Sequence, residues 1–145
     1  MNSITIRDMK PGDLEAVAAL SAELGYPSSR EDIARRFDPM RSRTDHAMMV
    51  AVTPEGSVAG WIQVHPVHTL ESDPYAEIGG LVVGERFRRH GAGRALVAEA
   101  ERRAREQGFA LIRVRSNVVR PEAHRFYPGV GFELVKTQHT YGKAL

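Results

Sequence analysis

Arginines and glycines are concentrated in one short run, Arg88-Arg89-His90-Gly91-Ala92-Gly93-Arg94, which we call the glycine-arginine turn. Glycines let the backbone approach a ligand closely, and arginines add charge-assisted hydrogen-bond donors. The run follows a hydrophobic strand pattern at 76–83 and precedes a helical pattern that ends near Gly108. Because the free N–H groups and the positive dipole end of a helix N-terminus attract anions, we predict a phosphate site here.

The remaining patterns predict the elements that must position this turn. Alternating or fully apolar runs indicate strands at 3–7, 47–52, 58–65, 76–83, 111–115, 132–136 and 139–141. Helical spacing, prolines and a Ser28/Glu31 capping-box pattern indicate helices that start near 11, 28, 91 and 121. We therefore predict an α/β fold with a mixed, mostly antiparallel sheet and flanking helices, in which the strands on either side of the 91–107 helix are parallel.

Two of these elements have faces that can be assigned from spacing alone. The helix at 91–107 carries a stripe of small and apolar residues that we expect to be buried, namely Ala92, Leu96, Ala100 and Ala104. The strand at 58–65 has one apolar face, and its opposite face carries Trp61, Gln63 and His65. Because this second face is too polar for a pure core, it is a candidate lining for a binding site.

Length and composition restrict the protein class. The 145 residues, 42% hydrophobic and 26% charged, suit one globular domain over 1–145. No run approaches the roughly 20 apolar residues of a membrane span, and the absence of cysteine suits a reducing compartment, so we expect a soluble cytoplasmic protein. The basic residues suggest nucleic acid as a partner, but only 7% of residues are aromatic, so we expect no nucleic-acid binding.

Three families place glycines between a strand and a helix, and the residues separate them. A P-loop requires Gly-Lys-Ser/Thr, which is missing, and a dinucleotide fingerprint requires a third glycine where Leu96 stands. The chain resembles the Gcn5-related N-acetyltransferase (GNAT) family, whose signature Arg/Gln-x-x-Gly-x-Gly/Ala reads here from Arg88 to Gly93. The resemblance continues through the neighbouring motifs Ile6-Arg7, Asp13-Leu14, Ala95-Leu96, Ser116-Asn117, Ala123, Phe126-Tyr127 and Gly131-Phe132.

The resemblance implies transfer of an acetyl group from acetyl-CoA to a primary amine. By analogy, a central pair of parallel strands splays apart, and the backbone of Leu81, Val82 and Val83 pairs with the pantetheine arm. The pyrophosphate would be held by the glycine-arginine turn, that is, by Arg88, Arg89, His90, Gly91, Ala92, Gly93 and Arg94. Asn117 lies where relatives often contact the cofactor arm, and His124 is a further candidate for cofactor contact, although a helical histidine can equally face solvent.

Acyl transfer requires an acid for the departing thiolate and a neutral amine. Tyr127 matches a tyrosine that often serves as this acid in the family; the alternative is that it only packs beside Phe126. Pro128, which follows it, departs from the common pattern and is expected to end the helix early. Glu77 has the spacing of the glutamate base in histone-acetylating relatives, but it can instead be a structural ion-pair partner, or no protein base acts.

The acceptor side is less well defined by the sequence. Candidate acceptor-binding residues are Tyr26, Trp61, Gln63 and His65, each with a purely structural alternative. The histidines lack the spacing of a metal site, so we predict no metal. We expect a small-molecule amine as the acceptor and no membrane partner, with a homodimer as a further expectation from the family. A protein or peptide acceptor, or a CoA-sensing domain without catalysis, remains the alternative.

Overall fold

The computed structural model describes residues 3–116 and 121–145. The chain divides into two compact units, Met1–Arg115 and Ser116–Leu145, and each is described by itself. The first unit holds a sheet of five strands, β1 (Thr5–Asp8), β2 (Ala47–Val52), β3 (Val58–Val67), β4 (Tyr75–Val83) and β5 (Ile112–Val114). Their order is β1-β2-β3-β4-β5, with antiparallel pairs throughout except for the parallel pair β4 and β5. The predicted mixed, mostly antiparallel α/β fold is confirmed.

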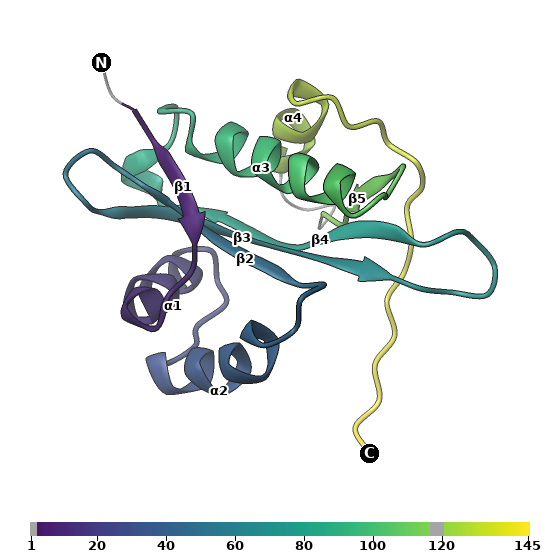
Figure 1. The fold of residues 1–145 in the computed structure, drawn as a ribbon, viewed down its shortest axis with the longest axis horizontal. Coiled ribbons are helices and arrows are strands. Elements are labelled where there is room, and N and C mark those ends of the chain that lie inside the picture. Colours follow the sequence, from purple (N-terminus) through teal and green to yellow (C-terminus); the bar gives the residue numbers. More distant parts are fainter. Residues whose placement is uncertain (1–2, 117–120) are drawn as a thin grey trace. The chain divides into compact units, whose positions relative to one another are not determined.

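Helices cover both faces of this sheet. The helices α1 (Leu14–Glu23) and α2 (Arg30–Arg41) lie on one face, and α3 (Ala92–Glu106) lies on the other (Figure 1). The predicted stripe of α3 is buried at Ala92, Leu96, Ala100 and Ala104, together with Val97. The stripe packs on β2, β3 and β4, where Ile62 and Val64 are buried on the facing side of the sheet. This packing fixes the end of α3 that carries the glycine-arginine turn.

The start of α2 differs from the prediction by one residue. Ser29, not Ser28, is the N-cap: its hydroxyl accepts from the Asp32 N–H at 3.0 Å, and the Asp32 carboxylate accepts from the Ser29 N–H at 3.2 Å. The pair Ser28 and Glu31 has the same spacing, so the pattern alone does not distinguish the two registers. Ser28 instead accepts a hydrogen bond from Arg36 at 2.9 Å.

The second unit contains α4 (Pro121–Gly129), which extends through Pro128 rather than ending before it. The predicted strands at 132–136 and 139–141 are wrong, because the described residues after α4 form no strand. Alternation of side chains is necessary for a strand but not sufficient, since a strand also requires a neighbouring chain for its backbone hydrogen bonds. In the described sheet, the parallel pair β4 and β5 therefore lies at an edge rather than in the centre.

No helix in the described residues is both long and apolar enough to cross a membrane.

Candidate active site

The glycine-arginine turn connects β4 to α3 through a short 3-10 turn, Glu85–Phe87. Gly91 is the N-cap of α3 and has a left-handed backbone, with φ 84° and ψ 5°, and Arg89 has φ 69°. Glycine adopts this region without strain, whereas a residue with a Cβ does so at a cost. The Gly91 carbonyl accepts the Ala95 N–H at 3.0 Å, which begins the helical ladder. The amides before Ala95 therefore point out of the helix end.

The charge around this helix end favours an anion. The first turn of α3 contains no acidic residue, and no side chain caps it. The side chains of Arg88, Arg89 and His90 are exposed. The sequence prediction is supported here by geometry, because outward amides, a left-handed glycine and exposed cations meet at one point.

The edge of β4 beside this turn is open over its second half. β5 pairs only with Ala76, Glu77 and Ile78 of β4, and the described residues form no β5 pairs beyond Ile78. A register shift in the β3–β4 pairing, just after Ile78, adds one residue to β4 at Gly79. Such bulges often redirect a strand beside a functional site. Leu81, Val82 and Val83 pair with β3 on one side and leave backbone groups on the other side for an extended ligand.

The polar face of β3 is arranged as the sequence predicted, but its members differ in what they contact. Trp61 covers Gly80 so closely that a Cβ there would lie 2.6 Å from the indole ring. Gln63 donates a hydrogen bond to Met40 Sδ of α2 at 3.2 Å, so its amide is directed to the helix. Tyr26, which is 55% exposed, lies in the connection between α1 and α2.

His65 and Glu77 are directly opposite each other on β3 and β4. His65 Nε2 lies 3.7 Å from Glu77 Oε2, and Arg115 Nε lies 3.3 Å from Glu77 Oε1. The Glu77 side chain is 14% exposed. The structure therefore shows Glu77 as an ion-pair partner, and this does not exclude a role as base, because its carboxylate still reaches the surface.

Sequence reasoning missed two contributors to this cluster, Arg115 and Gly79. Arg115 follows β5 and reaches Glu77 only because β5 lies parallel to β4. The Gly79-Gly80 pair inside a strand was a usable signal, since glycine within a strand often marks a bulge or a close approach.

Tyr127 lies in the second unit, on α4. Its ring packs edge-on against Phe126 and Phe132, with centroid distances of 5.2 and 5.7 Å. Burial raises the pKa of the Tyr127 hydroxyl above its usual value near 10, so the group stays protonated at neutral pH. His124, also on α4, is exposed, and Asn117 lies outside the described residues.

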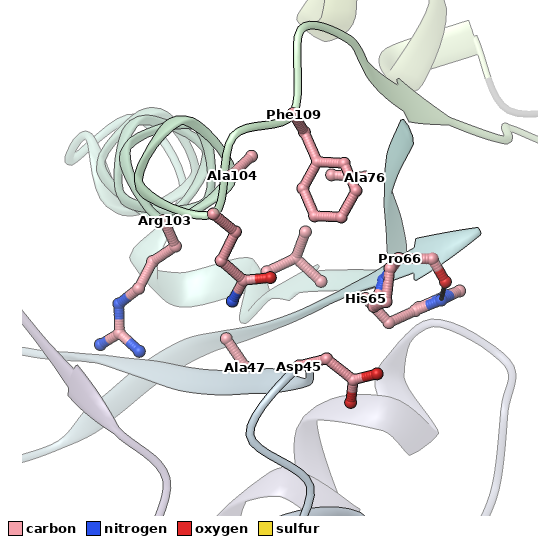
Figure 2. Close-up of a pocket in the computed structure, with 10 residues that line it drawn as sticks. Asp45, Ala47, His65, Pro66, Ala76, Arg103, Ala104 and Phe109 are labelled. Atoms are coloured by element: carbon pink, nitrogen blue, oxygen red, sulfur yellow. Dashed lines mark hydrogen bonds between the residues drawn. The ribbon is translucent and has the colours of Figure 1, made fainter. Parts of the chain in front are cut away.

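A small pocket occurs at the opposite end of α3 from the glycine-arginine turn. It is lined by Arg103 and Ala104 of α3, by Gln107 and Phe109 after it, and by residues of the sheet and its loops that include Asp45 and His65 (Figure 2). A helix of this length separates the two places by roughly 20 Å, so the pocket is not the anion site. Among the described residues, no group of three or more His, Asp or Glu side chains is placed to hold a metal ion.

Comparison with known proteins gives a family model and several relatives. The acetyltransferase (GNAT) family model matches residues 14–132. An aminoglycoside N(6')-acetyltransferase type 1 of Serratia marcescens is 25% identical over 137 residues, which cover 92% of this chain and 94% of that protein. An aminoalkylphosphonate N-acetyltransferase of Salmonella typhimurium strain LT2 is 35% identical over 91 residues, which cover 62% of this chain and 58% of that protein.

Solved structures have the same fold. A transcriptional regulator from Bacillus halodurans C-125 is 27% identical, with a TM-score of 0.86 over 97% of this chain and 100% of that chain. The aminoglycoside N-acetyltransferase AAC(6')-Iy, solved in complex with CoA, is 18% identical, with a TM-score of 0.86 over 100% of this chain and 97% of that chain.

Proposed function

The chain belongs to the GNAT family and is an N-acetyltransferase, and we propose that it transfers the acetyl group of acetyl-CoA directly to the primary amine of a small molecule. The family match runs from the first unit into the second, which supports the view that residues 1–145 act as one acetyltransferase domain. We also infer a cytoplasmic enzyme, a location in keeping with the lack of cysteine, and a homodimer as its assembly.

The proposed donor site is the glycine-arginine turn together with the open edge of β4. We expect the amides from Arg89 to Arg94 to bind the pyrophosphate and the backbone of 81–83 to pair with the pantetheine arm. Acetyl-CoA supplies the acetyl group as an activated thioester. The left-handed Gly91 at the start of α3, with exposed cations beside it and no acid in the first turn, is the observation that carries the proposal.

The proposed acceptor site is the polar face of the sheet around Glu77. Its carboxylate is suited to take a proton from an ammonium group, so that the amine can attack the thioester carbonyl carbon. Trp61 and His65 flank this region along β3, and Tyr26 is the candidate from the α1–α2 connection. Tyr127 is the proposed acid that protonates the departing thiolate, and its raised pKa means that the hydroxyl carries its proton at neutral pH. His124 and Asn117 remain proposed cofactor contacts.

The test combines binding with turnover. We expect acetyl-CoA to raise the melting temperature, because a ligand that binds only the folded state stabilises that state. Release of free CoA thiol is then measured with a panel of amines that includes an aminoglycoside and an aminoalkylphosphonate, the acceptors of the named relatives. No thermal shift at millimolar acetyl-CoA would refute the donor site. A thermal shift without turnover of any small amine or peptide would favour a CoA sensor, and turnover of peptides alone would favour a peptide acetyltransferase.

A further inference from the structure

The contact that His65 Nδ1 makes indicates which of the two ring nitrogens carries a hydrogen. Nδ1 lies 3.1 Å from the carbonyl oxygen of its neighbour Pro66 (Figure 2). A carbonyl oxygen can only accept a hydrogen bond, so the hydrogen is on Nδ1. Nε2, which faces Glu77, is therefore left with a lone pair.

When neither group is protonated, no hydrogen lies between His65 Nε2 and the Glu77 carboxylate. A bare Nε2 and a carboxylate oxygen are both acceptors, and they face each other at 3.7 Å with side chains only 23% and 14% exposed. One proton placed on either atom converts this contact into an attractive one. A proton between Nε2 and the carboxylate oxygen would therefore be held by both groups.

The surroundings hold the His65 ring in this orientation. His46 stacks on it, with ring centroids 5.5 Å apart and planes at 20°. A Cβ at Gly79 would lie 3.1 Å from Nε2 and Cδ2 of the same ring, so a larger residue there would require the ring to shift. The ring thus has a defined place on the face of the sheet, with Glu77 on one side and His46 on another.

Charged groups approach this pair from several elements. Arg115, after β5, faces Glu77 Oε1, and Arg103 of α3 lines the same pocket as His65. Asp45 lies 3.9 Å from His46 Nε2 and is itself paired with Arg43. Burial lowers the pKa of His46, so a neutral ring stacks on His65 and does not add a second charge beside it.

We propose that His65 is the positioning residue of the acetyl transfer, holding Glu77 through Nε2 and sharing the proton that Glu77 removes from the acceptor. This proposal rests on the proposed function of Glu77 as base. In the step, the N–H bond of the acceptor ammonium breaks and its proton binds to the Glu77 carboxylate, shared with the lone pair of His65 Nε2. The electron pair left on the amine nitrogen forms the bond to the thioester carbonyl carbon, and the carbonyl π electrons move to oxygen. When they return, the C–S bond breaks, the nitrogen loses a second proton to become the amide, and the thiolate is protonated to the free CoA thiol. The proton held by Glu77 and His65 then leaves to solvent.

A double-mutant cycle with Glu77→Gln and His65→Gln tests this coupling. His65→Gln is expected to lower kcat/KM for the acceptor about tenfold and to move its rise with pH to lower pH, because a lone carboxylate holds the proton less firmly. In the Glu77→Gln background, the same change is expected to have no further effect. Additive losses would overturn the proposal. His68→Gln, in the exposed loop after β3, is the matched control and should leave the pH profile unchanged.

Two further measurements test the role of His65 if a variant folds poorly or no acceptor is turned over. Gly79→Ala displaces the ring without removing the histidine, and it should reproduce the pH shift of His65→Gln. Nitrogen NMR of the unliganded protein should show His65 with a hydrogen on Nδ1 and a titrating Nε2 whose midpoint moves in Glu77→Gln, whereas His68 does not move. A hydrogen fixed on Nε2, or a midpoint unaffected by Glu77→Gln, would refute the role of His65 even when acetyl transfer itself is observed.

Discussion

The proposed donor site and the proposed acceptor face are built in opposite ways. The pyrophosphate part of the proposed donor site consists of contiguous residues, Arg88 to Arg94, and its binding groups are mainly backbone amides at the start of α3. The acceptor face is assembled from single side chains on separate strands, with His65 on β3, Glu77 on β4 and Arg115 after β5. The difference explains why one family can keep a common donor while its acceptors vary, since a side chain is replaced more easily than a backbone conformation.

Tyr127, the proposed acid, belongs to neither region. We expect its substitution to have the largest effect on turnover. We expect Tyr127→Phe to lower kcat about 100-fold, because it removes the only acidic proton of that side chain, and to leave the KM for acetyl-CoA nearly unchanged. Steady-state thiol release at saturating acceptor measures both quantities. Tyr141→Phe, a change at a 90% exposed tyrosine, is the control and should be silent. Unaltered kcat in Tyr127→Phe would remove this residue from the acid role.

Substitutions in the proposed donor site should change the KM for acetyl-CoA rather than kcat. Gly91→Val forces a β-branched residue into a left-handed backbone at φ 84° and disturbs the outward amides. We expect the KM for acetyl-CoA to rise about 30-fold, or ~2 kcal/mol, with a much smaller change in the KM for the amine.

The control for Gly91→Val is Gly108→Val, beyond the other end of α3. Gly108 has nearly the same backbone, with φ 89°, so the substitution causes similar strain far from the turn. It should lower the melting temperature without changing the KM for acetyl-CoA. An equal rise of this KM in both variants would mean that general strain, not the turn, determines cofactor binding.

We expect the smallest effect on activity from residues that stabilise the fold, such as Asp13, because they belong to neither region. Asp13, which is buried, accepts two hydrogen bonds from the Arg7 guanidinium at 2.8 and 2.9 Å and one from the Lys10 N–H. The bond from Arg7, followed by that from Lys10, lowers the pKa of Asp13 below its ordinary value of 3.8. The resulting stability is present above that value and is lost as the pH falls through it toward the folded-state pKa.

Asp13→Asn is therefore expected to cost about 2 kcal/mol in the free energy of unfolding at pH 7 and to weaken the loss of stability in acid. Urea unfolding at several pH values measures this. Glu106→Gln, at an exposed ion pair with Arg102, should cost less than about 0.5 kcal/mol. If Asp13→Asn remains folded but the KM for acetyl-CoA or for the amine changes strongly, then Asp13 and the two proposed sites are coupled more tightly than we infer.

Some features of this fold were predictable from the sequence, and others were not. The stripe of α3, the polar face of β3 and the position of the glycine-arginine turn at the start of α3 were predictable, because each depends on spacing within one element. The capping register of α2 was missed, since two serines satisfied the same local rule. The C-terminal strands were wrong, because alternation was present in the sequence and the pairing partner was not.

The sequence by itself determined the family and the position of the glycine-arginine turn at the start of α3, because these depend on contiguous residue types and on backbone geometry that the residues dictate locally. Only the tertiary structure showed which groups surround Glu77, whose role the sequence left open between base and ion-pair partner. Its partners, His65 and Arg115, lie 12 and 38 positions away and meet it only through strand pairing. Contacts of this kind depend on register across the sheet, which no local pattern specifies.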